Sequence, residues 1–217
     1  MGVSVDTIKY IEPSEARAII NSVQLVSRNP DQDTIFVELL WQTGGRVTEV
    51  VTMVPERIGT TSVVLNNLKQ NKRDGGKTVH DSTAVKEVEI SAALCNRLKN
   101  YCRANGIKQG EWIFKSPRHS KEGHMTRWYA WKLITKASEA GLVFKFGKRN
   151  PRTGGRYKGA TPHNFRHGNA MKLLEETQDI TVVASQLGHS DVRTTQRYAY
   201  VKRPHIKKII QNIDWET

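Results

Sequence analysis

The residue types that could do chemistry are gathered in the last quarter of this chain. His163 and Arg166 are three positions apart, His189 follows a glycine, and Tyr198 lies nine positions beyond His189. Two imidazoles, a guanidinium and a phenol are the groups needed to hold a phosphodiester and attack it with a tyrosine oxygen. Together with Arg46 far upstream, they predict DNA strand cleavage through a covalent phosphotyrosine, without a metal ion or any other cofactor.

Two arginines are predicted to hold the non-bridging oxygens of the phosphate, because a guanidinium stays charged and donates two parallel hydrogen bonds. Arg46 follows a Gly-Gly pair and is expected to open a short helix, with Glu49 on the same face to fix its guanidinium. Arg166 shares a helical face with His163, which is then available as a proton donor or acceptor. His189 is expected at a glycine turn, where its imidazole can donate to a phosphate oxygen.

Each of these residues also has a plain structural interpretation, and only their joint occurrence favours chemistry. His163 and His167 are four positions apart and could bind zinc, but Asn164 stands where a metalloprotease helix has glutamate. No third ligand accompanies the pair, so no metal site is predicted, and His167 is expected to pack or cap. Tyr198 could be a core residue, and Tyr200 competes with it as the nucleophile.

The charge balance favours a polyanionic partner. Lys and Arg number 34 against 21 Asp and Glu, which gives a net charge of +13. Two basic segments, residues 69–73 and 145–158, carry much of this excess. Cations set against phosphates release condensed counterions, so nucleic acid is the favoured partner. A membrane is disfavoured, because neither segment lies on an expected amphipathic helix and no apolar run approaches the roughly 20 residues that span a bilayer.

The motifs resemble those of the catalytic domain of the tyrosine recombinase (phage integrase) family. The matching segments are residues 43–49 (TGGRVTE), 163–167 (HNFRH), 187–191 (LGHSD) and 194–198 (TTQRY). They resemble the first arginine motif, the His-x-x-Arg motif, the second-histidine motif and the nucleophile motif of that family. Residues 12–16 resemble the opening of the domain, so the resemblance covers nearly the whole chain. The chain departs from the family pattern at two positions. The family usually has a larger apolar residue where this chain has Gly45, and often a histidine where it has Tyr200.

The resemblance implies a role for each residue. The implied contacts to the scissile phosphate are Arg46, His163, Arg166 and His189. Tyr198 would form a 3′-phosphotyrosyl link and expel a 5′-hydroxyl. The family also has a catalytic lysine in a β-hairpin, which falls here on Lys69, with Lys72 as the alternative. The implied protein is a site-specific recombinase or integrase that acts on double-stranded DNA, self-associates as a tetrameric synapse, and works in the cytoplasm at the nucleoid of a host cell.

Two other functions remain open at this point. Type IB topoisomerases use similar chemistry, so relaxation of supercoiled DNA is the first alternative. A DNA-binding regulator that uses the same helices without catalysis is the second, and the complete Arg/His/Arg/His/Tyr set disfavours it. The family's N-terminal helical domain is expected to be absent, because the catalytic domain opens within about 15 residues of Met1. The chain is then either a fragment or a minimal enzyme.

The elements that must position these residues form a mainly helical α+β domain, residues 1–217, with a small antiparallel sheet. The expected helices cover residues 13–26, 30 to the Gly44-Gly45 pair, 46–53, 91–105, 125–140, 161–176, 181–187, 192–201 and 205–213. Strands are expected at residues 61–65, 85–90 and 112–114, with a polar excursion at 66–84 and a loop at 146–159. By resemblance, helix 205–213 is a tail that docks on a neighbouring subunit; the alternative is that its apolar stripe packs on the core of its own chain. Cys95 and Cys102 are expected to be free thiols.

Overall fold

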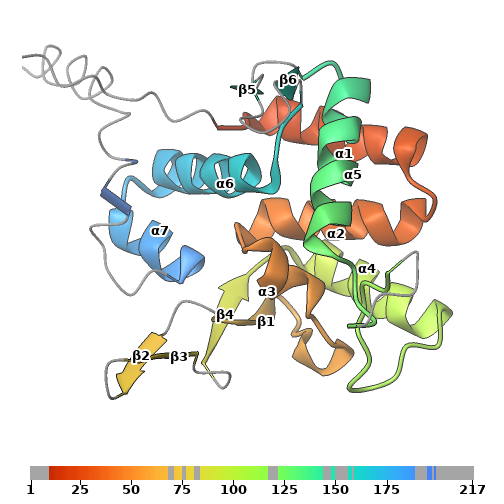
Figure 1. The fold of residues 1–217 in the computed structure, drawn as a ribbon. Helices are drawn as coiled ribbons and strands as arrows, with labels where there is room; N and C mark the ends of the chain where they lie inside the picture. Colours follow the sequence, from red (N-terminus) through yellow and green to blue (C-terminus); the bar gives the residue numbers. More distant parts are fainter. Residues whose placement is uncertain are drawn as a thin grey trace, which may run out of the picture.

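The computed structural model describes residues 10–67, 71–74, 77–80, 84–116, 122–143, 148–149, 156–157, 159–188, 195–196 and 198. Within these residues the chain is mainly helical with short antiparallel strand pairs, as predicted (Figure 1). The helices are α1 (Pro13–Val26), α2 (Pro30–Thr43), α3 (Val47–Val51), α4 (Ala92–Ala104), α5 (Arg127–Ala140), α6 (Pro162–Thr177) and α7 (Ile180–Leu187). The strands are β1 (Ser62–Asn66), β2 (Asn71–Asp74), β3 (Lys77–His80), β4 (Val85–Glu89), β5 (Lys148–Arg149) and β6 (Arg156–Tyr157).

The turn between α2 and α3 is set by Gly44. This residue caps α2 in the left-handed region, with φ of 57°, and its amide donates to the Leu40 carbonyl. A Cβ atom at Gly44 would lie 2.6 Å from the Asn169 side-chain oxygen and 2.6 Å from a methyl of Leu187. The turn therefore requires glycine for its backbone conformation and for the close approach of α6 and α7.

The main strand pair joins β1 to β4 in an antiparallel register that pairs Ser62 with Glu89 and Leu65 with Lys86. Alternate residues of β4 face the core, which places Lys86 on the same side as Val88. A lysine at a buried strand position is rare and calls for charged or hydrogen-bonding partners.

Helix α2 lies at the centre of the helical layer and packs against α1, α4 and α6, while α7 packs against α6 and the β4 strand (Figure 1). The buried face of α2 contributes Ile35, Phe36, Leu39 and Leu40 to the main core. Trp41 of α2 meets Phe165 of α6 edge to face, with ring centroids 6.2 Å apart. This packing fixes the start of α6 against the end of α2, and so brings together the two arginine motifs.

The strand expected at residues 112–114 was wrong. Residues 112–114 form no strand. The Ile113 amide donates to the Met53 carbonyl and the Phe114 carbonyl accepts from the Met125 amide, and neither bond belongs to a pair of strands. The polar excursion 66–84 contains the β2–β3 hairpin, and the loop 146–159 contains the β5–β6 pair. Helix 205–213 lies outside the described residues, as does most of helix 192–201, of which residues 195, 196 and 198 are helical. Cys95 and Cys102 are free, as expected, and both are buried.

None of the helices in the described part of the chain is long and apolar enough to cross a membrane.

Candidate active site

A pocket of about 410 Å³ lies between α3, α5 and α6. Three of the predicted residues line it: Arg46 at the start of α3, and His163 and Arg166 on the first turns of α6. The fold therefore brings two guanidiniums and an imidazole together from positions more than a hundred residues apart. Arg127 and Trp131 of α5 also line the pocket. Neither was singled out from the sequence, although their spacing of four residues at a helix start puts a cation and an aromatic ring on one face.

Arg46 is held by Glu49, as its position on the same helical face predicted. The guanidinium Nη1 lies 2.5 Å from Glu49 Oε1, and the Arg46 amide donates to Oε2 at 2.9 Å. Glu49 is fully buried. Burial alone would raise the pKa of its carboxyl, but Lys86 and Arg46 hold the pKa below its usual value. The ionised carboxylate thus aims the Arg46 side chain, which keeps 23% of its surface exposed toward the pocket.

Arg166 bridges the ends of two helices. Its Nη1 donates to the Gly44 carbonyl at 2.5 Å, and its Nη2 donates to the Leu187 carbonyl at 2.9 Å. These are carbonyls at the carboxyl ends of α2 and α7, where the helix dipole favours a cation. Burial and the neighbouring Arg46 lower the pKa of Arg166 to about 10, so the guanidinium stays charged at neutral pH. The side chain is therefore locked in place while still lining the pocket.

The phenol of Tyr198 contacts His167, a residue that was expected from the sequence only to pack or cap. Tyr198 is 2% exposed, and its hydroxyl lies 2.8 Å from His167 Nδ1. His167 in turn meets His163 edge to face, with ring centroids 4.2 Å apart. A chain of rings thus leads from the pocket residue His163 through His167 to Tyr198. Tyr198 also lies in an apolar cluster with Met171 and other side chains of α6 and α7.

Two of the predicted site residues, Lys69 and His189, lie outside the described residues, as does the competing nucleophile Tyr200. Lys72 belongs to β2, where its backbone pairs with Val79. Among the residues that the structure describes, no group of three His, Cys, Asp or Glu side chains could hold a metal ion.

Lys86 joins the site without having been predicted from its position in the sequence. Its Nζ lies 3.0 Å from Glu49 Oε2 and donates to the Leu187 carbonyl at 3.0 Å. The one sequence signal that sets it apart from the other lysines is its position on the predicted strand. Polar and apolar residues largely alternate along that strand, and Lys86 stands at a position that faces the core.

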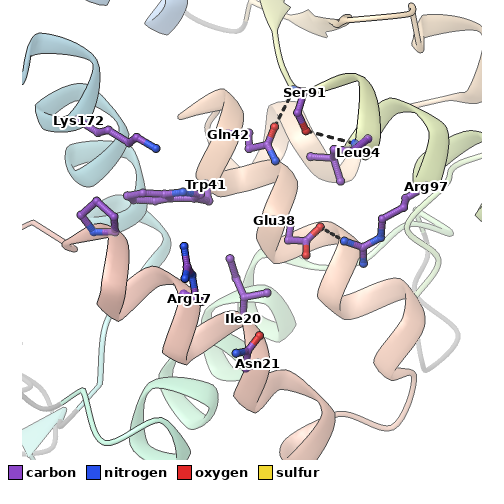
Figure 2. Close-up of a pocket in the computed structure, with 12 residues that line it drawn as sticks. Arg17, Ile20, Asn21, Glu38, Trp41, Gln42, Ser91, Leu94, Arg97 and Lys172 are labelled. Atoms are coloured by element: carbon purple, nitrogen blue, oxygen red, sulfur yellow. Dashed lines mark hydrogen bonds and ion pairs between the residues drawn. The ribbon is translucent and has the colours of Figure 1, made fainter. Parts of the chain in front are cut away.

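A second pocket, of about 320 Å³, lies apart from the first, between α1, α2, α4 and α6 (Figure 2). Trp41 lies between Arg17 and Lys172 in this view, and Glu38 pairs with Arg97 across the pocket. The amide of Ser91 donates to Gln42 at 2.8 Å and ties α4 to α2.

Comparison with known proteins identifies the class. The model for the phage integrase family matches residues 9–205, and the chain belongs to that family. Similar proteins within it are named tyrosine recombinases. The chain is 26% identical over 214 residues to tyrosine recombinase XerD of Staphylococcus epidermidis, covering 95% of this chain and 65% of that protein. It is 30% identical over 185 residues to XerD of Shewanella oneidensis, covering 83% and 53%. The chain therefore spans less than two thirds of these relatives.

Solved structures share the fold. The XerA recombinase superposes with a TM-score of 0.69 at 17% identity, covering 99% of this chain and 67% of that one. The catalytic domain of bacteriophage HP1 integrase gives a TM-score of 0.59 at 19% identity, covering 94% of this chain and 95% of that one. The observed fold is thus that of a tyrosine recombinase catalytic domain.

Proposed function

We propose that this chain cuts and rejoins double-stranded DNA as a site-specific recombinase, through a covalent link between Tyr198 and a 3′-phosphate. The observation that carries the proposal is the pocket that Arg46, His163 and Arg166 line together. Its two guanidiniums and its imidazole suit a single phosphodiester, and Tyr198 contacts His167, whose ring meets that of the pocket residue His163. Family membership and relatives named tyrosine recombinases support the same activity. Among similar structures, XerH is described as bound to its difH substrate.

The proposed step keeps all atoms and charges in balance. The phenol oxygen of Tyr198 attacks phosphorus, the bond from phosphorus to the 5′ oxygen breaks, and the 5′ oxygen takes up a proton and leaves as a hydroxyl. Attack by a 5′-hydroxyl reverses the step and frees the tyrosine. Arg46 and Arg166 stabilise the charge that develops on the non-bridging oxygens. His163 and His189 donate hydrogen bonds to the phosphate, and Lys69 supplies the proton to the leaving oxygen.

The phenol must lose its own proton during the attack. Among the residues that the structure describes, His167 can serve as the base, because its Nδ1 lies 2.8 Å from the hydroxyl. An imidazole can accept that proton near neutral pH. The neighbouring cation Arg166 favours the phenolate, because the opposite charge stabilises the ionised form. We assign to His167 the holding and deprotonation of Tyr198.

DNA is proposed to run across the first turns of α5. Arg127 lines the pocket, and Trp128 is 63% exposed, with the Lys132 ammonium 4.7 Å from its ring centroid. This face therefore adds cations and a ring that can contact a sugar or base next to the scissile phosphate.

Covalent capture tests the activity. Incubate the protein with a random-sequence pool of nicked duplexes, denature the mixture, and isolate DNA that stays attached to protein. Wild-type protein and Tyr200→Phe should yield an adduct, whereas Tyr198→Phe should bind DNA and yield none. The adduct should also form in excess chelator, because the arginines carry the electrostatic stabilisation. An adduct that survives in Tyr198→Phe, or cleavage that requires added Mg²⁺ or Zn²⁺, contradicts the proposal.

The captured sequences separate the alternatives. A shared sequence at the attachment points supports site-specific recombination, whereas relaxation of supercoiled plasmid without sequence preference supports a topoisomerase-like activity. DNA binding without any adduct supports a regulator.

Self-association on DNA is the second part of the proposal. Deletion of residues 205–217 should spare binding to one site and impair joining of two sites, as measured by gel shift on one-site and two-site duplexes. Unfolding of the truncated protein would show instead that this segment packs on its own core.

A further inference from the structure

Lys86 occupies a position at which a lysine is costly. It lies on the core face of β4, and its side chain is 7% exposed. Its neighbour on this face is the fully buried Val88. Burial of an ammonium is unfavourable unless charges and hydrogen-bond acceptors surround it. Its partners should therefore reveal what the residue does.

The ammonium of Lys86 meets both halves of the candidate active site. On one side it lies 3.0 Å from Glu49 Oε2, and Glu49 holds the side chain and amide of Arg46. On the other side it donates at 3.0 Å to the Leu187 carbonyl, which also accepts from Arg166 at 2.9 Å. Lys86 thus shares one partner with Arg46 and one with Arg166, the arginines of the two motifs.

The stem of Lys86 also fits the turn that follows α7. A Cβ atom on Gly188 would lie 2.5 Å from Lys86 Cδ, so the turn packs directly on this side chain. Gly188 has φ of 64° and is followed in the sequence by His189. A second contact fixes the same junction, because Gln186 donates to the Glu89 carbonyl at 2.7 Å and accepts from the Glu89 amide at 3.3 Å. The end of α7 is therefore fastened to β4 at two points.

We propose that Lys86 is a positioning residue: it fixes Glu49, and through it Arg46, relative to the carboxyl end of α7, and so sets the spacing of the two arginine motifs and the turn at Gly188. This inference rests on the proposed DNA cleavage. Lys86 itself is not among the residues that line the pocket in the described part of the chain. It acts through its neighbours and gives no proton to the DNA, which distinguishes it from Lys69.

The electrostatics agree with this geometry. Burial lowers the pKa of Lys86 to about 8, with Arg166 and Arg46 acting in the same direction and Glu49 opposing them. Near neutral pH the ammonium is therefore largely charged and paired, and it offsets the charge of a carboxylate that would otherwise attract Arg46 alone.

The test compares Lys86→Met with wild type on a nicked duplex recovered by covalent capture. We expect the single-turnover rate of adduct formation to fall roughly ten- to a hundredfold, since small misplacements of catalytic groups have effects of this size. The dissociation constant for the same duplex should stay within about twofold, because the DNA-contacting side chains remain. Lys108→Met, at an exposed loop position, serves as the control and should match wild type.

A second substrate separates positioning from proton donation. In this duplex the bridging 5′ oxygen is replaced by sulfur, a leaving group that needs no proton. Lys86→Met should be slowed equally on both substrates, whereas Lys69→Ala should recover on the sulfur substrate. Recovery of Lys86→Met on sulfur would overturn the positioning role, and so would a wild-type rate on normal DNA.

Folding and activity are controlled separately. If Lys86→Met unfolds, Lys86→Met/Glu49→Gln removes both charges, and its rate is compared with that of Glu49→Gln alone. A slower double variant supports the contact with α7, whereas equal rates, or unfolding of the double variant too, overturn the proposal. If wild-type protein forms no adduct, the proposed function fails; if it does and Lys86→Met keeps pace, only the role of Lys86 fails.

Discussion

Replacing Arg166 by lysine tests whether this one side chain both stabilises the fold and contributes to catalysis in the pocket. The guanidinium donates to the Gly44 carbonyl at 2.5 Å and to the Leu187 carbonyl at 2.9 Å. An ammonium is a compact donor and cannot span both carbonyls in the geometry of a planar fork. Arg166→Lys should therefore lose one of these two hydrogen bonds. A hydrogen bond to a charged group is worth about 1.5–3 kcal/mol, and each kcal/mol shifts the melting temperature of a chain of this size by about 2–4 °C.

The expected fall in melting temperature is thus roughly 3–12 °C, measured by circular dichroism. Arg127→Lys is the matched control, because Arg127 lines the same pocket but is exposed, and it should melt as wild type does. The rate of adduct formation should also fall in Arg166→Lys, by about 10²–10³, which is the usual effect of losing one donor to a transition-state oxygen. An unchanged melting temperature would refute the bridge between the two helices. A lower melting temperature with an unchanged rate would refute the role in the pocket.

Three further predictions concern the tyrosine, a turn and a titrating lysine. Tyr198→Phe should lower the melting temperature by roughly 2–4 °C while retaining DNA binding, because His167 loses a hydrogen bond worth about 1 kcal/mol; equal stability would argue against this bond. Gly44→Ala should lower the free energy of unfolding in urea by about 1–3 kcal/mol, since alanine is strained at φ of 57° and its Cβ would lie 2.6 Å from α6 and α7 atoms. The pKa of Lys86 is about 8 in the folded chain and 10.5 in the unfolded one. Between these values the unfolded chain holds the extra proton, so this group makes stability rise with pH. Urea unfolding at pH 8–10 should show a steeper rise in wild type than in Lys86→Met, and parallel curves would contradict the shift.

Apart from the joint role of Arg46 and Arg166, which their motifs indicated, the parts of the site that the sequence predicted are those built from local spacing. Arg46 and Glu49, like His163 and Arg166, are three residues apart, and one turn of helix brings such pairs onto one face. Gly44 predicts the end of α2, because only glycine enters the left-handed region without strain. Helix bounds followed from the same local rules, and α1 matches its predicted range of residues 13–26.

The parts that could not be predicted depend on pairs far apart in the chain. His167 and Tyr198 are 31 residues apart, and Lys86 and Leu187 are 101 apart. No periodicity links such residues, and their contact follows only from the packing of α6, α7 and β4. The apolar run at residues 112–114 was wrongly predicted to be a strand for a related reason. Ile113 and Phe114 are fully buried, so their apolar and aromatic character reflects the core and not a strand ladder.

The charges around the pocket explain why the site is built from long-range contacts. Arg46, Arg127 and Arg166 line the pocket, and Lys86 lies behind it. Among the described contacts of these four cations, Glu49 is the carboxylate that pairs with two of them. The Gly44 and Leu187 carbonyls supply only partial charges. Such an excess of positive charge is costly in an empty pocket and is offset when an anion enters. The fold meets this cost by fastening each cation, except the exposed Arg127, to a helix end or to one buried carboxylate. A preorganised cationic pocket of this kind needs little rearrangement when charge develops on a bound phosphate, which is where electrostatic stabilisation is most effective.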